Sequence, residues 1–300
     1  MEKLLKEHLE YIKSLWFIVN DETKVIWYLR WVWYYNLKAY FNIFENKNID
    51  FQIIIDYYLF DKNLRVLNLN IIESIETFIK NLFILNFWNS YSNKDIYNDK
   101  IIRIKGEEKK IQDNRIEFIN EKIKELYKKD LEVKNILDKY NILNSEVFIN
   151  KLTFGEVIRF IQDLNKENKI LISKIIWIKL KLLLNWLDCL VYLRNLCSHW
   201  ENIFSKRMIK SVEWKDINNL FWIENNNSYI SYFAIISIFK ENLIPNYNWE
   251  EKVFNKMKQY NIKLSDFWQK KETFPNELES EAWKVLVNPL YEKYVKKSNF

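Results

Sequence analysis

An apolar helical segment that ends in a cluster of polar side chains organises this sequence. It reads Trp186-Leu187-Asp188-Cys189-Leu190-Val191-Tyr192-Leu193-Arg194-Asn195-Leu196-Cys197-Ser198-His199. Its apolar residues recur at three- and four-residue steps, which predicts an α-helix with one buried face. The last residues, Arg194, Asn195, Ser198 and His199, carry hydrogen-bonding groups that a plain core does not accommodate. The segment therefore predicts a core helix whose final turn carries chemistry.

The composition predicts an all-α fold. The chain has 300 residues, of which 49% are hydrophobic, but only 2 Gly and 3 Pro. Hairpins and sheets need turn residues at short intervals. A chain of this length that lacks them is expected to form long helices joined by polar loops.

The charge balance is compatible with a nucleic-acid partner but does not require one. There are 46 Lys and Arg against 40 Asp and Glu, which gives a net charge of +6, and 17% of the residues are aromatic. Basic charge with aromatic side chains suits nucleic-acid binding. AT-rich coding sequence, however, enriches any protein in Ile, Lys, Asn, Phe and Tyr, so composition alone leaves the question open.

The cysteines and the apolar segments predict a reduced, cytoplasmic protein without a membrane span. Cys189 and Cys197 would lie roughly 12 Å apart along one helix, too far to form a disulfide. No signal peptide and no uninterrupted apolar segment of membrane-spanning length is present. The most apolar window, 228–239, is short and predicts a buried helix.

The N-terminal region predicts two helices. Residues 2–20 have amphipathic spacing and carry His8, which we expect to be solvated. The acidic run 21–23 suits the start of the next helix. Its body, 27–41, is exceptionally aromatic. Such a run can stack bases, but aromatic residues all round a helix more often pack on several sides, so we favour a core role.

Residues 51–86 predict a helix, a bend at residues 61–63 and a longer second helix. Four polar residues of this region would share an arc of about 140°. They are Arg65, Asn68, Glu73 and Glu76. This face is either an exposed surface with ion pairs or a support for the arginine of the central helix.

Several segments resemble one protein family. Arg194-Asn195-Leu196-Cys197-Ser198-His199 is similar to the Arg-x-x-x-x-His motif of HEPN ribonucleases. The sequence around this motif resembles that of abortive-infection (Abi) proteins of the AbiD/AbiF type, which are relatives of the HEPN domains in type VI CRISPR effectors. Further similar blocks are the aromatic run 27–41, Phe60-Asp61 to Glu76, Leu152 to Glu156 and, loosely, Phe274-Pro275 to Trp283.

The resemblance implies a multi-helix HEPN-like bundle with helical extensions at both ends. The expected organisation is a single unit over residues 1–300. Within it we expect aromatic helices at 1–50, a HEPN-like core at 51–210 with an insertion near 89–110, and a C-terminal extension at 211–300. Gly155, inside a helical pattern, is expected to allow a close approach between helices.

The implied activity is metal-independent RNA cleavage. RNA supplies its own nucleophile, the 2′-hydroxyl, so a histidine can move protons and an arginine can bind the phosphate. These roles fall to His199 and Arg194, with Asn195 orienting either group. The supporting or RNA-binding residues would be Arg65, Glu73, Glu76, Ser198, Lys206 and Arg207. Neither a metal nor another cofactor is expected, because the chain's two histidines and two cysteines lack ligand spacing.

Two features set this motif apart. Family members often continue with an arginine, an apolar residue, an aromatic residue and an asparagine, whereas this chain has Asn202 and Ser205, so a phosphate contact by that family arginine is in doubt. On an ideal helix Arg194 and His199 also point about 140° apart. Either the helix unwinds near 197–198, or two chains pair so that both motifs line one cleft. A single motif per chain favours a homodimer.

The sequence thus predicts an endoribonuclease that acts as an abortive-infection or toxin-type effector. Its partners would be single-stranded RNA and an antitoxin, either a small noncoding RNA or a protein. One alternative is a non-catalytic helical module that binds RNA or nucleotide. Another is that Arg194 and His199 merely cap the central helix.

Overall fold

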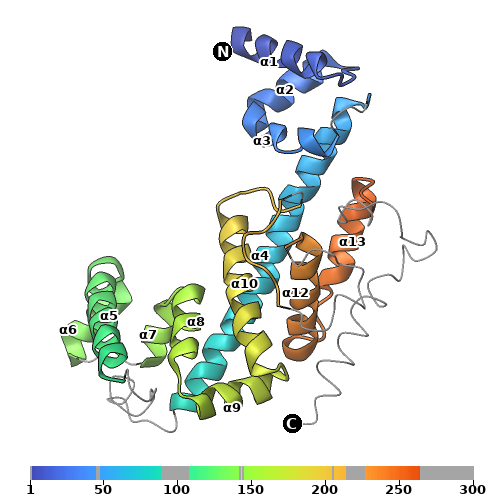
Figure 1. Ribbon diagram of the computed structural model, residues 1–300. Coiled ribbons are helices and arrows are strands. Elements are labelled where there is room, and N and C mark those ends of the chain that lie inside the picture. The colour runs from blue at the N-terminus through green and yellow to red at the C-terminus, as the bar shows by residue number, and fades with distance from the viewer. Residues whose placement is uncertain are drawn as a thin grey trace. The chain divides into compact units, whose positions relative to one another are not determined.

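The protein is helical throughout the part of the chain that the structure describes, which confirms the all-α prediction. The computed structural model describes residues 2–44, 48–88, 108–141, 143, 145–204, 206–213 and 227–263 (Figure 1). Within these ranges the extended backbone amounts to one isolated bridge between Ile18 and Asp50. Every helix there is too short or too polar to cross a bilayer.

The helices have the following bounds. They are α1 Glu2–Ser14, α2 Glu22–Val32, α3 Tyr34–Lys38, η1 Phe41–Ile43, α4 Phe51–Trp88, α5 Glu108–Lys129, α6 Leu131–Tyr140, α7 Ser145–Lys151, α8 Phe154–Asp163, α9 Lys166–Ile176, α10 Leu180–Ser198, α12 Tyr229–Leu243 and α13 Trp249–Gln259.

Two compact units share these helices. The first draws on residues 1–71, 192–238 and 246–290, and the second on 72–191, 239–245 and 291–300. Helices α4, α10 and α12 contribute residues to both. The boundaries of these units differ from the segment boundaries expected from sequence, after residues 50 and 210. The division into aromatic helices, HEPN-like core and C-terminal extension stays a prediction. Of the insertion expected near 89–110, residues 89–107 lie outside the described residues, whereas residues 108–110 form the start of helix α5. The Phe274 to Trp283 block also lies outside the described residues.

The second unit shows how local sequence sets helix ends and helix contacts. Thr153 and Glu156 form a capping box at the start of α8, with each side chain bonding the other residue's backbone N–H. Gly155 lies between these two residues, in the first turn of α8, and a Cβ added there would lie 3.4 Å from Val191 Cγ1 of α10. A larger side chain would push the helices apart, so the expected close approach is present.

Helix α4 corrects one prediction. It runs without interruption from Phe51 to Trp88, so residues 61–63 lie inside a regular helix and no bend separates two helices. The polar group at that point does not break it, because Asn63 Nδ2 donates to the carbonyl of Leu59, one turn earlier, at 2.7 Å. The segment contains neither Gly nor Pro, the usual causes of a break.

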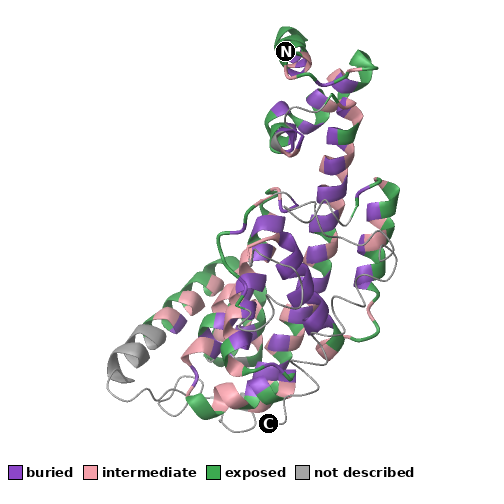
Figure 2. Cartoon of the chain, turned by 45° about the vertical axis from the view of Figure 1, so that its right-hand side comes forward, coloured by how far each residue is buried: buried purple, intermediate pink, exposed green. Residues whose placement is uncertain are grey.

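The N-terminal aromatic region is less buried than predicted. Residues 27–41 are divided between α2, α3 and η1, and the break falls at Trp33, which has φ 71°. Val25, Leu29 and Val32 bury one face of α2, while Trp27 and Trp31 are exposed. Figure 2 shows buried and exposed residues alternating along the N-terminal helices. The predicted core role therefore holds for one face of the helix only.

His8 also differs from its prediction. Its side chain is half-buried rather than solvated, because the imidazole stacks on the Tyr34 ring at 4.3 Å with the planes 2° apart. Trp33 adds an edge contact at 6.3 Å. The histidine thus serves to join α1 to α3.

Candidate functional site

The end of α10 keeps its helical geometry through the motif. The His199 N–H still donates to the Asn195 carbonyl at 3.0 Å. The helix then closes with Trp200 in the left-handed region at φ 61°, where Trp200 N bonds Cys197 O at 3.3 Å and Glu201 N bonds Leu196 O at 3.0 Å. This pair of bonds is a Schellman motif, which satisfies the last carbonyls with backbone alone.

This geometry removes one of the two ways to join the motif residues. Because α10 does not unwind near residues 197–198, Arg194 and His199 keep their separation of about 140° around the axis. Neither side chain hydrogen-bonds the terminal carbonyls within the described ranges, so the capping alternative lacks the contact that it needs.

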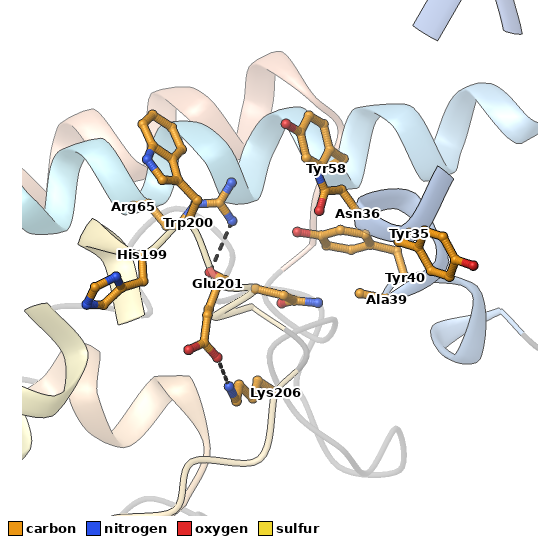
Figure 3. A pocket seen from close by; sticks show the side chains of 11 residues that line it. Tyr35, Asn36, Ala39, Tyr40, Tyr58, Arg65, His199, Trp200, Glu201 and Lys206 are labelled. Carbon is orange, nitrogen blue, oxygen red and sulfur yellow. Dashed lines mark hydrogen bonds and ion pairs between the residues drawn. The ribbon is translucent and has the colours of Figure 1, made fainter. Parts of the chain in front are cut away.

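His199 stands at a cavity of about 570 Å³ in the first unit (Figure 3). The lining residues come from α3, from α4 and from the end of α10 with the segment that follows it. They are Tyr35, Asn36, Ala39, Tyr40, Tyr58, Arg65, His199, Trp200, Glu201, Asn202 and Lys206. The cavity thus combines aromatic walls, amide groups and three cationic or ionisable nitrogen groups. The His199 side chain is exposed and makes no hydrogen bond or ion pair with the part of the chain that is described.

A buried carboxylate holds the cavity floor together. Asp61 of α4 is fully buried and pairs with Arg65, one turn along the same helix. Tyr40 Oη donates to Asp61 Oδ2 at 2.6 Å, and the Phe204 N–H donates to Oδ1 at 2.9 Å. Ile203 N donates to the same oxygen at 3.3 Å. Asp61 therefore links the turn after α3, helix α4 and the segment after the motif at one point.

Arg65 completes this link to the motif. Its Nη1 also donates to the backbone carbonyl of Glu201 at 3.3 Å, two residues after His199 (Figure 3). The side chain of Arg65 is 3% exposed, so the guanidinium is a fixed group in the floor rather than a mobile one. The position of the backbone directly after His199 is thus set by Arg65 and Asp61.

Burial shifts the pKa values of this group. It raises the pKa of Asp61, against the opposing effects of the Arg65 charge and the Tyr40 hydrogen bond. Because every contact of this carboxyl comes from a donor, the ionised form is the one that the site accommodates. Burial also raises the pKa of Tyr40 well above its usual value, with Asp61 adding to the effect. On α10, burial and the Asp61 charge raise the pKa of the Cys197 thiol to about 12.

The comparison with protein families matches the same region. The model of the family described as Abi-like protein matches residues 27–205, more than half of the chain. The chain belongs to the Abi-like protein family. No curated protein and no solved structure matches it. The matched range contains every cavity residue except Lys206, together with Arg194.

Three predicted motif residues of this Abi-like protein lie outside the cavity. Arg194 is half-buried, does not line the cavity, and forms no ion pair or hydrogen bond with the described residues. Asn195 is exposed, and Ser198 Oγ donates to its carbonyl at 3.0 Å. Within one chain the structure therefore brings His199, but not Arg194 or Asn195, to the cavity.

The predicted supporting residues are divided in the same way. Lys206 lines the cavity and forms an ion pair with Glu201, while Arg207 is exposed and does not line it. Arg65 lies in the floor, but it supports Asp61 and the Glu201 carbonyl rather than Arg194.

The four polar residues predicted to share one face of α4 differ in their burial. Arg65 and Asn68 are buried in the first unit, whereas Glu73 of the second unit is exposed. Glu76 pairs with Lys80 at 2.8 Å, and the two side chains are only 15% and 12% exposed, so this ion pair is largely buried. Burial on a long helix can change within two turns when the helix passes from one packing environment to another.

Sequence reasoning missed Asp61, Tyr40 and Tyr58. The first had a readable signal, because an Asp four residues before an Arg on a helix predicts an ion pair. Nothing in the sequence indicated that Tyr40, 21 residues earlier, would donate to the same carboxylate. Among the described residues no cluster of three or more His, Cys, Asp or Glu is placed to hold a metal ion.

Proposed function

We propose that this Abi-like protein is a metal-independent endoribonuclease that acts as an abortive-infection effector. The observation that carries the proposal is the setting of His199, an exposed imidazole that has no hydrogen-bonding or ion-pair partner among the described residues and lines a cavity together with Arg65 and Lys206. A histidine titrates near neutral pH and can accept or donate a proton there. The two cations of the cavity are ion-paired, Arg65 with Asp61 and Lys206 with Glu201, so we assign the contact with the phosphate to Arg194 instead.

The proposed reaction needs only RNA and these side chains. The 2′-oxygen attacks the adjacent phosphorus, and the bond from phosphorus to the 5′-oxygen breaks. One group takes the proton of the 2′-hydroxyl and one gives a proton to the leaving 5′-oxygen, so the products are a 2′,3′-cyclic phosphate and a 5′-hydroxyl. We assign proton transfer to His199 and charge stabilisation on the phosphate to Arg194, with Asn195 orienting either group.

The regular helix supports a site shared by two chains. Since Arg194 of one chain points away from its own His199, a cleft between two copies is the remaining way to bring the groups to one phosphate. In this arrangement Arg194 of one subunit would act with His199 of the other.

Mixing two inactive variants tests this arrangement. In a mixed dimer of Arg194→Ala and His199→Ala subunits, one of the two shared sites contains both native residues. After equal mixing and re-association, about a quarter of the wild-type activity should return, because half of the dimers are mixed and each has one intact site. A mixture that stays inactive, or an active monomer, would contradict the shared site.

The basic activity is tested with purified protein and mixed RNAs in EDTA. We expect cleavage to persist and the fragments to carry 5′-hydroxyl and 2′,3′-cyclic phosphate ends. His199→Ala should abolish the cleavage with the helical circular dichroism unchanged. Activity that requires a divalent metal, or ends with 5′-phosphate, would overturn the mechanism.

A second candidate function is a non-catalytic module that binds RNA or nucleotide. It is favoured by the position of Arg194 outside the cavity. The cavity of a single chain therefore contains groups that can bind a ligand, but only one of the two motif residues, His199. The EDTA experiment separates the two, because the module would bind RNA without producing fragments.

Membership of the Abi-like family supports a proposal for the biological role. An RNA-cleaving abortive-infection effector harms the cell that makes it, so we propose that it works in the cytoplasm and is restrained by an antitoxin, either a small noncoding RNA or a protein. Expression of the wild-type chain alone should stop growth, while the His199→Ala variant should not.

A further inference from the structure

Helix α2 carries a line of aromatic side chains on one face. Trp27, Tyr28 and Trp31 fall within an arc of about 100° around the helix axis. The opposite face, formed by Val25, Leu29 and Val32, is buried. We call the three rings on the outer face the aromatic stripe.

The stripe is a continuous surface of rings. The centroids lie 5.0 Å apart for Trp27 and Tyr28, 5.5 Å for Trp27 and Trp31, and 6.2 Å for Tyr28 and Trp31. Trp27 remains 55% exposed and Trp31 52% exposed. Scattered exposed apolar residues need no explanation, but a contiguous cluster of large ones marks an interaction site.

A lysine of α4 connects the stripe to the cavity. Lys62 Nζ lies 4.6 Å from the centre of the Trp31 ring. On the helix, Lys62 shares a face with Tyr58 and Arg65, which lie four residues before it and three after it, and both line the cavity. The described residues give Lys62 no acidic partner. The stripe and the cavity are therefore joined along one face of α4, on which Lys62 is the cation without an acidic partner in the described part of the chain.

A second aromatic link lies on α3. The chain turns at Trp33, whose backbone has φ 71° and ψ 135°, an uncommon conformation for a residue with a bulky side chain. Tyr35, two residues later, is 63% exposed and lines the cavity (Figure 3). Backbone strain of this kind persists at functional sites more often than elsewhere.

We propose that the aromatic stripe is a stacking platform for the bases of single-stranded RNA, which it leads past Lys62 and Tyr35 into the cavity at His199. This inference rests on the proposed function, because it takes RNA as the ligand of the cavity. Rings offer every base a flat partner, whatever the sequence, and an adjacent cation contacts the backbone phosphates. The continuity of rings, lysine and cavity fits an extended chain of alternating bases and phosphates better than a compact ligand.

The platform can be tested without cleavage by working in the His199→Ala protein. The probe is a fluorescently labelled oligouridine of about 12 nucleotides, within the range that single-stranded sites cover. Replacing Trp27 and Trp31 together by Ala should weaken binding about tenfold or more in fluorescence anisotropy. The double variant should also show less quenching of tryptophan fluorescence when RNA is added.

A matched control is available on α6. Tyr140 is 61% exposed and has Lys139 Nζ 4.9 Å from its ring centre, so it repeats the lysine-on-ring contact away from the cavity. Tyr140→Ala should change the affinity less than about twofold. Light scattering on each variant reports whether the same residues hold two chains together.

The outcomes separate the platform from the proposed catalysis. Unchanged RNA affinity in the Trp27→Ala, Trp31→Ala double variant overturns the platform, and so does a loss of dimer mass, which would make the stripe a contact between chains. If the stripe binds RNA but the wild-type chain never cuts it, the platform stands and the nuclease proposal fails. If the double variant with His199 intact cuts and binds as the wild type does, the nuclease stands and the platform fails.

Discussion

Two arginines of the first unit, Arg65 and Arg194, differ in their burial and in their interaction partners. Arg65 is 3% exposed, pairs with Asp61 and holds the Glu201 carbonyl. Arg194 is half-buried and has no partner among the described residues. A buried and paired arginine is a structural group, whereas an unpaired one near the surface is available to a ligand or to a second chain.

The difference separates a region whose side chains hold the fold together from a region whose side chains are available for catalysis or binding. The Asp61 group determines the path of residues 201–204, directly after His199, through four donors to one carboxylate. The motif helix itself ends with backbone hydrogen bonds and leaves the side chains of Arg194 and His199 unpartnered in the described part of the molecule. Substitutions at the two places should therefore have opposite consequences.

The largest effect is expected at Asp61. Asp61→Ala leaves the Arg65 charge buried without its partner and removes the acceptor of Tyr40, Ile203 and Phe204. Breaking a buried ion pair in this way costs about 3–5 kcal/mol. The free energy of unfolding from urea titration measures it. Glu125→Ala is the control, since its pair with Lys129 lies on an exposed helix face and such a pair is worth about 0–1 kcal/mol. Equal losses at the two positions would show that Asp61 is no special anchor.

The next largest effect should be a loss of activity without a loss of stability. Arg194→Ala removes a charge that stabilises the transition state, and such groups are worth about 10²–10³ in rate. Since the side chain has no partner within the described residues, unfolding should change by less than about 0.5 kcal/mol. Cleavage rates and urea titrations on the same samples test this. If the variant is strongly destabilised, Arg194 resembles Arg65 after all and its proposed role is lost.

The sequence predicted local structure well where one face of a helix decides it. The spacing around Trp186 predicted α10, the acidic residues at 21–23 predicted the start of α2, and the scarcity of Gly and Pro predicted an all-helical chain. These properties depend on neighbours within a few residues. The continuous α4 was missed because polar residues at 61–63 suggested a bend, although an Asp that is buried with an Arg one turn away does not break a helix.

The site was harder to predict because its parts come from distant segments. The motif identified His199, but the cavity beside it needs α3 and α4, which lie more than 130 residues earlier. No periodicity records that Tyr40 and the Phe204 N–H share one carboxylate. Helix geometry predicted the separation of Arg194 and His199 for a regular helix, but the sequence left local unwinding near residues 197–198 open as an alternative.

A smaller effect distinguishes binding from proton transfer. The affinity for single-stranded RNA should fall with salt, because phosphate contacts release counterions. Arg194→Ala should weaken binding and reduce the slope of log affinity against log salt by about 0.7, the value for one phosphate on a single strand. His199→Ala should leave both unchanged, since a group that moves protons adds little ground-state affinity. Titrations at several salt concentrations, with Arg159→Ala on α8 as a charge-matched control, decide the point.

The smallest effect concerns Cys197, which lies on the buried face of α10. Cys197 lies between Arg194 and His199 in sequence but is 1% exposed, and burial next to the Asp61 charge raises its pKa to about 12. The thiolate is the reactive form, so at pH 8.5 the shift alone should slow alkylation about a thousandfold against a free cysteine. Because the raised pKa favours the neutral thiol in the fold, its contribution to stability is complete below about pH 9 and is lost between about pH 9 and 12. Iodoacetamide labelling of Cys197 in a Cys189→Ala protein, followed by mass spectrometry, should show almost no adduct until urea is added. Rapid labelling of the folded protein would mean that the face of α10 carrying Cys197 becomes exposed to solvent. The distinction between the fixed group around Asp61 and the accessible residues Arg194 and His199 would then be lost.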